Sequence, residues 1–304
     1  MDAYFIDHGF ERSKSESTLY VKTQDTSTLI VALYVDALLF CGDDEKMIHD
    51  FKIEMMKRYE MSDMGLLHHF LGMEIYQEND GVFICQRKYA ENILKKFGMS
   101  DCNPTLIPLA VNQKMKKEDG EKKIDACIYR SMSESTLSWC NKERVLRYIK
   151  DLTNFGIKYV KGAQVNLQGY CDSDWAGCLD DMKSTTGHSF SLGSSVFSWT
   201  SKKQESVAQS TAEAGYVAAA MATSHVYWLR KILGDIGMNR TRHINIKYHF
   251  IREAIEECEV QLTFSKSEDQ VADIFTKSLP KEKFFKFREL LGVMEHHIKR
   301  ENCS

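Results

Sequence analysis

The sequence predicts an α/β fold, and two kinds of segment lead to that prediction. Runs rich in valine, leucine and aromatic residues, separated by turn residues, predict β-hairpins at 29–40, 67–85 and 187–200. Segments with apolar residues at spacings of three and four predict amphipathic helices, the longest at 210–233. With 304 residues, 43% of them hydrophobic, the chain is long enough for two domains with cores of their own.

Composition and charge narrow the class of protein. Only 3 prolines and 17 glycines occur, which argues against a long disordered chain. The 9 cysteines are scattered singly, so we expect neither a zinc site nor a disulfide framework, and free thiols fit a reducing compartment. The net charge of −3 does not favour nucleic-acid binding, although a local basic patch can provide it in an acidic protein.

The sequence also bears on location. The N-terminal residues do not combine a basic region with an apolar one, so we expect no signal peptide. The longest apolar run, 29–41, is interrupted by Asp36 and is too short to span a bilayer. We therefore expect an intracellular protein of the cytoplasm or the nucleus, without membrane contact.

Two helices carry apolar stripes that predict their buried faces. In the helix expected at 43–60, Asp43 and Asp44 suit the positive N-terminal end, and the stripe comprises Ile48, Phe51, Met55 and Tyr59. In the helix expected at 210–233, the stripe comprises Val217, Met221, His225 (or Ser224), Trp228 and Ile232. Both stripes indicate packing and imply no chemistry.

The segment 169–177, Gly-Tyr-Cys-Asp-Ser-Asp-Trp-Ala-Gly, organises the C-terminal half. It predicts a strand that delivers Asp172 near its end, followed by a hairpin and then a helix with an early carboxylate, Glu213. This layout is typical of a metal-dependent nuclease, in which carboxylates from different elements hold two Mg²⁺ ions about 4 Å apart.

Six motifs in the C-terminal half closely resemble the RNase H domain of copia-type LTR retrotransposon Pol polyproteins. They lie at 169–177, 183–187, 198–204, 210–214, 228–230 and 272–277. The N-terminal third resembles the reverse transcriptase of the same polyproteins, at 33–37, 70–74 and 86–90. Together the motifs extend over nearly the whole chain in the order of the family.

The resemblance implies four parts. Residues 1–108 correspond to an α+β reverse transcriptase palm-like remnant, and 109–163 to a linker with a shortened thumb or connection remnant. Residues 164–290 correspond to an RNase H-like domain, a mixed sheet flanked by helices that includes a strand at 260–265. Residues 291–304 form a tail.

At the polymerase site, the resemblance supplies one carboxylate. The family carries two adjacent aspartates at a hairpin turn, where they hold the metal ions of nucleotide transfer. The first matches Asp36, and the second position holds Ala37. One carboxylate cannot organise two Mg²⁺ ions, so we expect no DNA polymerase activity.

At the RNase H site, the family uses four carboxylates, and two of them match this chain. Asp172 and Asp273 match the first and the fourth, which makes them the expected metal ligands and catalytic residues. The position of the second, a glutamate, holds Gly215. The strand that carries the third is missing, and Asp235 is the only acid nearby.

Glu213 is the weakest candidate for a catalytic role. It lies two residues before Gly215, and two residues along a helix rotate a side chain by roughly 200°. Ser210 and Glu213 also form a capping box, in which we expect Glu213 to accept from the Ser210 amide. Capping is therefore the preferred interpretation of Glu213.

The resemblance implies a fragment of a reverse transcriptase and RNase H polyprotein that acts on RNA–DNA hybrids with a two-ion Mg²⁺ site. Because several carboxylates are absent, we expect that site to be incomplete and both activities to be impaired or lost. The alternative is a non-catalytic remnant, either a decayed copy or one retained for binding nucleic acid or protein. A binding module requires a contiguous basic surface, for which the candidates are Lys183, Lys202, Lys203, Arg240 and Arg242.

Overall fold

The computed structural model describes residues 1–111, 139–238 and 265–296. These residues divide into two compact units, one built on residues 1–67 and one that begins at His68. The longest described helix contributes to both units, because its residues from Ser224 onward group with the first. Both units combine helices with antiparallel sheets, which confirms the predicted α/β class.

The first unit is a four-stranded antiparallel sheet covered by helices. The strands pair in the order β1-β2-β3-β4. Their bounds, with those of the helices, are α1 Asp2–Asp7, β1 Glu11–Arg12, β2 Leu19–Gln24, β3 Ser27–Tyr34, β4 Ala37–Gly42 and α2 Glu45–Arg58. The predicted hairpin at 29–40 is confirmed by the pairing of β3 with β4.

Helix α2 begins and packs as its sequence predicts. The Asp44 carboxylate caps it by accepting from the backbone N–H of Met47 at 2.7 Å. Phe51 and Met55 are buried in an aromatic-rich core. The other two members of the predicted stripe pack against the same core, which confirms the stripe.

The second unit contains a five-stranded antiparallel sheet in the order β12-β8-β7-β6-β5. The strands are β5 His69–Phe70, β6 Met73–Glu78, β7 Gly81–Cys85, β8 Phe155–Val160 and β12 Val293–Glu295. The helices beside them are α3 Arg87–Lys96, α5 Trp139–Asp151 and η1 Leu152–Asn154. The sheet therefore joins segments that lie more than 200 residues apart in the sequence.

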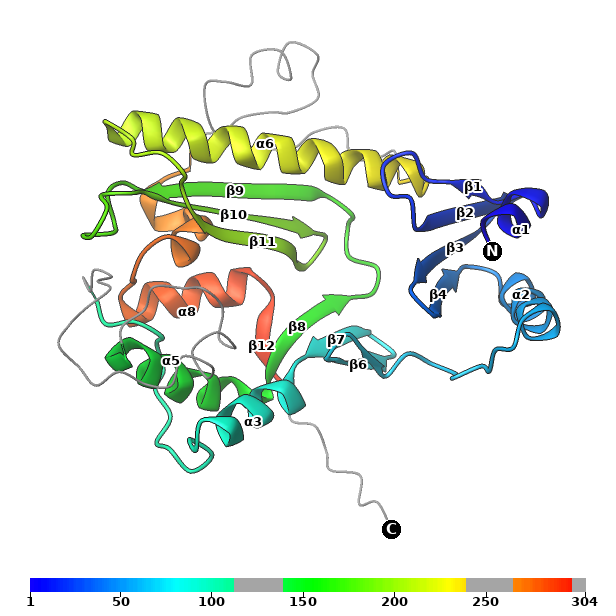
Figure 1. The fold of residues 1–304 in the computed structure, drawn as a ribbon, viewed down its shortest axis with the longest axis horizontal. Coiled ribbons are helices and arrows are strands. Elements are labelled where there is room, and N and C mark those ends of the chain that lie inside the picture. Colours follow the sequence, from blue (N-terminus) through cyan, green and yellow to red (C-terminus); the bar gives the residue numbers. More distant parts are fainter. Residues whose placement is uncertain (112–138, 239–264, 297–304) are drawn as a thin grey trace. The chain divides into compact units, whose positions relative to one another are not determined.

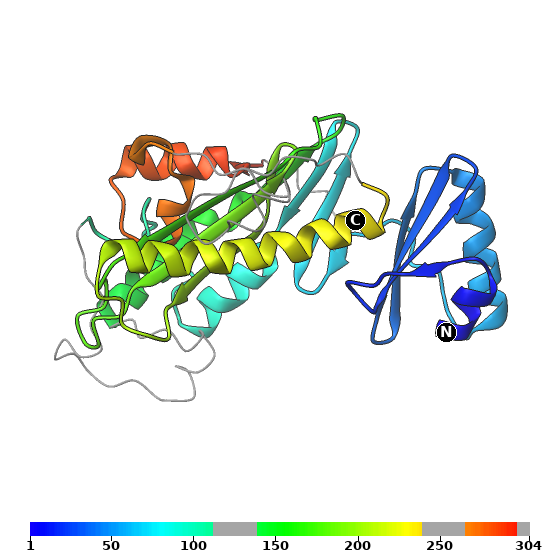
Figure 2. The ribbon, with the colours of Figure 1, turned by 90° about the horizontal axis from the view of Figure 1, so that it is seen from above.

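A three-stranded sheet forms the other half of the second unit. Its strands, β9 Leu167–Asp174, β10 Thr185–Leu192 and β11 Ser195–Lys203, pair antiparallel in the order β11-β10-β9. Helix α6, Thr211–Asp235, runs along one face (Figure 1 and Figure 2). On the opposite face lie η3 Val271–Phe275, followed by α8 Lys281–Leu290, with η2 Ser267–Asp269 just before η3. The strand expected at 260–265 falls almost wholly outside the described residues.

The two faces of this sheet are defined by specific contacts. On one face, Gln204 Nε2 donates to Ala214 O of α6 and to Thr186 Oγ1 of β10, both at 2.9 Å. On the other, Thr276 Oγ1 donates to Asp172 of β9 at 2.5 Å. Successive strand residues point to opposite faces, so Asp172 faces η3 and its neighbour Ser173 faces α6.

The predicted stripe of α6 is wrong, because the buried residues of its first half are alanines: Ala214, Ala218, Ala219 and Ala222. Trp228 of the predicted stripe is 40% exposed. Small residues let the helix lie close to the sheet. A prediction of the buried face that relies on the spacing of large apolar side chains does not detect them. Within the described ranges, no helix has the length and apolarity to cross a membrane.

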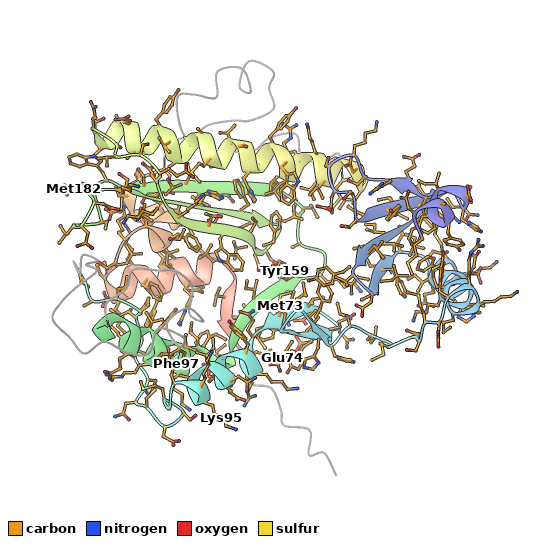
Figure 3. The ribbon with its side chains drawn as sticks, in the orientation of Figure 1. Met73, Glu74, Lys95, Phe97, Tyr159 and Met182 are labelled. Atoms are coloured by element: carbon orange, nitrogen blue, oxygen red, sulfur yellow. The ribbon has the colours of Figure 1, made fainter. Side chains whose placement is uncertain are left out.

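Glu74 ties β6 to helix α3 and is labelled in Figure 3. Its side chain is buried, with one carboxylate oxygen accepting from Lys88 N at 2.7 Å and the other from the Tyr76 hydroxyl at 3.1 Å. We expect Glu74→Ala to lower the free energy of unfolding by about 1–2 kcal/mol, because α3 loses an N-terminal acceptor.

Urea unfolding of the full chain measures that loss, and Glu91→Ala is the matched control. Glu91 forms only an exposed ion pair with Arg87 on the same helix, so its removal should cost roughly 0.3–0.5 kcal/mol. Equal losses in the two variants would contradict the capping role of Glu74.

Candidate carboxylate site

Asp172 and Asp273, the two predicted RNase H ligands, come together on one face of the β9–β11 sheet. Asp172 lies in β9 and pairs in register with Gly187 of β10. Asp273 lies in the short helix η3 and is only 2% exposed. The segment that carries Asp273 therefore packs directly over the strand pair that carries Asp172.

Gly187 makes this close approach possible. A Cβ at position 187 would lie 2.6 Å from Thr276 Cγ2 and 2.9 Å from Phe275 Cβ. Contacts this short do not occur between real side chains, so a larger residue would push η3 away from β10. The absent side chain thus sets the depth at which Asp273 sits beside Asp172.

Two lysines complete the site. Lys277 Nζ lies 3.2 Å from Asp172 Oδ2 and 2.9 Å from Asp273 Oδ1, so that one ammonium contacts both carboxylates. Lys283 Nζ of α8 lies 2.7 Å from Asp273 Oδ2. We call Asp172, Asp273, Thr276, Lys277 and Lys283 the lysine–carboxylate cluster. Its two negative and two positive groups balance.

Burial and charge act in opposite directions within the cluster. Burial raises the pKa of Asp172, while the Thr276 hydroxyl and the Lys277 ammonium act against that rise. Burial lowers the pKa of Lys277, but attraction to Asp172 and Asp273 outweighs it, so that the net shift is upward. Lys277 therefore remains an ammonium at neutral pH.

The cluster does not fit the two-ion Mg²⁺ site that the resemblance implies. Mg²⁺ requires several oxygen ligands at about 2.0–2.1 Å in octahedral geometry. Among the described residues, no group of three or more His, Cys, Asp or Glu side chains is placed to hold a metal ion. One oxygen of each carboxylate, Asp172 Oδ2 and Asp273 Oδ1, already contacts the Lys277 ammonium.

Glu213 caps helix α6. Ser210 Oγ accepts from Glu213 N at 3.1 Å, and Glu213 Oε2 accepts from a backbone N–H at 2.6 Å. That N–H belongs to Gln209, which corrects the expected Ser210 amide by one residue. At Gly215, a Cβ would meet only Ser173 Oγ, at 3.9 Å, so this position lies beside the strand residue next to Asp172.

Asp235 and Asp36 belong to the first compact unit, whereas the residues of the lysine–carboxylate cluster belong to the second. Asp235 Oδ2 accepts from Ser13 Oγ at 2.6 Å and from Ser15 N at 3.0 Å, which gives it a structural role. Asp36 follows Val35 in the tight turn between β3 and β4, where Val35 has a φ of +50°.

The chain resembles known proteins over most of its length. The family model described as reverse transcriptase (RNA-dependent DNA polymerase) matches residues 1–111. The Pol polyprotein from transposon RE1 of Arabidopsis thaliana is 29% identical over 95% of this chain, and that from TNT 1-94 of Nicotiana tabacum is 28% identical over 96%. The chain belongs to the copia-type retrotransposon Pol family.

This Pol-family chain is shorter than those relatives. It spans about a quarter of their length, 23% of the RE1 polyprotein and 26% of the TNT 1-94 polyprotein. An uncharacterized mitochondrial protein of Arabidopsis thaliana is 32% identical over 66% of this chain and 94% of its own length. No solved structure matches the chain.

The predicted basic surface of the Pol-family chain is partly neutralised. Lys203 Nζ lies 2.8 Å from Asp181 Oδ2, and this contact is the main cause that lowers the pKa of Asp181 to about 2. Lys202 has Glu205 at 3.8 Å. Arg240 and Arg242 lie outside the described residues.

The sequence analysis missed both lysines of the cluster. Lys277 follows Asp273 by four residues, the spacing at which helical side chains of opposite charge meet, so that pair was within reach of sequence reasoning. Lys283 lies in the next helix, and no local spacing connects it with Asp273.

Substitutions of two glycines test the packing around the cluster. We expect Gly187→Ala to destabilise the protein by about 1–3 kcal/mol, because the new methyl group displaces η3. Gly215→Ala is the matched control and should stabilise α6 by up to about 1 kcal/mol, because a Cβ there has room. Denaturant unfolding measures both, and shifts of the same sign would refute this account of Gly187.

Asp235 generates a prediction of pH dependence. Burial acts to raise its pKa, but the hydrogen bonds from Ser13 and Ser15 outweigh burial, so that the net shift is downward. A depressed carboxyl pKa gives stability that is present above the ordinary value of 3.8 and is lost as the pH falls through the folded-state value.

We therefore expect Asp235→Asn to cost about 1 kcal/mol at pH 7 and distinctly less at pH 3. Unfolding of wild type and variant in urea at the two pH values measures the difference. A cost that does not change with pH would show that the charge of Asp235 is irrelevant.

Proposed function

We propose that this Pol-family chain is a reverse transcriptase and RNase H segment in which both catalytic activities are impaired. The match of residues 1–111 to reverse transcriptases supports the first part of the segment. The order of the C-terminal motifs and the approach of Asp172 to Asp273 support the second. We propose the palm-like part at 1–108 and the RNase H-like part at 164–290, joined by 109–163 and followed by a tail at 291–304.

The polymerase activity of the segment is impaired at the β3–β4 turn. Two-ion catalysis requires adjacent carboxylates that would hold the metal ions, which in turn neutralise the nucleotide phosphates. The turn offers Asp36 alone, because its neighbour is Ala37. An alanine has no atom that can bind a metal ion, so the turn can hold at most a fraction of the required ligand set.

The observation that carries the proposal for RNase H is the contact of Lys277 with both Asp172 and Asp273. Hydrolysis of the RNA strand requires Mg²⁺ ions to activate water and to stabilise the leaving oxygen. We propose that this two-ion site is incomplete. The carboxylates from β9 and η3 are neutralised by lysines, and the glutamate position on α6 holds Gly215.

The second candidate function is nucleic-acid binding without catalysis. Strand β11 exposes the Trp199 ring, which is 52% accessible, on one face and the exposed Lys202 on the other, because the two lie three residues apart. An exposed aromatic ring suits base stacking, and an exposed cation suits phosphate contact. Binding of this kind weakens steeply with salt, whereas weak binding that ignores salt would count against it.

Cleavage of a labelled RNA–DNA hybrid and extension of a primed template test the main proposal. We expect no product in Mg²⁺ or Mn²⁺ beyond that of two matched variants, Asp172→Asn for cleavage and Asp36→Asn for extension. An active reverse transcriptase in the same buffers shows that the assay detects product.

Cleavage by wild type that Asp172→Asn abolishes would overturn the proposal for RNase H. Primer extension that Asp36→Asn abolishes would overturn it for the polymerase. Circular dichroism and a cooperative unfolding transition establish that each inactive sample is folded, so that inactivity is assigned to the site.

A further inference from the structure

The lysine–carboxylate cluster has the geometry of an internal ion site. An ammonium group has three N–H donors, and Lys277 directs its nitrogen to within hydrogen-bonding distance of Asp172 Oδ2 and Asp273 Oδ1. A divalent cation between the carboxylates would need carboxylate oxygens as ligands, and one oxygen of each is already in contact with this ammonium. Lys277 and such a cation therefore compete for one position.

Burial makes this competition unequal. The side chain of Asp273 is 3% exposed, while that of Lys277 is 39% exposed, so the ammonium covers the carboxylate on its accessible side. A buried carboxylate needs a counter-charge, and Lys277 supplies one that belongs to the chain and is therefore always present. A metal ion would have to expel the ammonium and then tolerate its positive charge nearby.

We propose that Lys277 is a built-in counter-ion that excludes divalent cations from Asp172 and Asp273, and that its removal uncovers a cation site. Without Lys277, Asp172 Oδ2 and Asp273 Oδ1 lose their shared ammonium, while the Thr276 hydroxyl still donates to Asp172 Oδ2 and Lys283 remains on the other oxygen of Asp273. Carboxylate oxygens of this kind are ligands for Mg²⁺ and Mn²⁺.

This inference deepens the proposed loss of RNase H activity, but it rests on the geometry of the cluster. Its test measures metal binding and stability, so a chain that cleaves no hybrid can still refute it. Conversely, a chain that binds no metal ion for another reason leaves the proposed function standing.

The experiment uses the full chain, stripped of metal with a chelator and then titrated with Mn²⁺. Bound Mn²⁺ is measured from the loss of the free-ion electron paramagnetic resonance signal, and Tm is recorded with and without the ion. The variants are Lys277→Met, which keeps the length of the side chain, and the double variant Lys277→Met with Asp172→Asn. The matched control is Lys286→Met, which removes a lysine whose ammonium lies 2.9 Å from Asp269 outside the cluster.

We expect neither wild type nor Lys286→Met to show Mn²⁺ binding that depends on Asp172, and we expect no Mn²⁺-dependent change in their Tm. Lys277→Met should bind Mn²⁺ roughly tenfold or more tighter than wild type, because the variant lacks the positive charge of the Lys277 ammonium close to the ion. Its Tm should rise with Mn²⁺. The double variant should lose both effects.

Three outcomes overturn the proposal. The first is Mn²⁺ binding by wild type that Asp172→Asn abolishes. The second is a folded Lys277→Met chain that gains no affinity. The third is a Lys277→Met chain that is unfolded and that Mn²⁺ does not rescue, because an uncovered cation site would couple binding to folding.

Discussion

The close approach of η3 to β10 over Gly187 is the constraint on which the candidate site depends. It places Asp273 beside Asp172, although 101 positions separate them in the sequence, and it buries the carboxylate of Asp273. A carboxylate that is withdrawn from water is tolerated only with compensating charge. Packing at one glycine thus creates the electrostatic requirement that the neighbouring side chains must meet.

The compensating charges come from the same segment as the buried carboxylate. Lys277 lies one turn after Asp273, and Lys283 lies in the helix that follows. The segment that packs on the sheet therefore carries two lysine ammonium groups and one buried carboxylate, Asp273. The second carboxylate that contacts Lys277 is Asp172 of the sheet. The interaction that stabilises the docked segment also fills the space between the carboxylates, so stability and closure of the site have one cause.

The sequence predicted those elements whose signals are local. Helix α2, with its acidic N-terminal end, and the hairpins followed from spacing and turn residues, because these signals act within a few positions. The prediction of the buried face of α6 was wrong, because alanines such as Ala218 carry little weight when an apolar stripe is identified from the sequence. The pairing of β8 with β12 joins distant segments, and such pairing leaves no trace in local periodicity.

The candidate site shows the same division between local and distant signals. Motif matching identified Asp172 and Asp273, and the structure brings them together, but their chemistry depends on neighbours that motif matching ignores. In the proposed RNase H site, Gly215 occupies a position where the family is expected to carry a ligand, whereas Lys277 contacts both Asp172 and Asp273, and the two features are independent. A glutamate at position 215 would lie beside Ser173 and would leave the contacts of Lys277 with Asp172 and Asp273 in place. The number of carboxylates is therefore a weaker guide to this site than the charge that surrounds them.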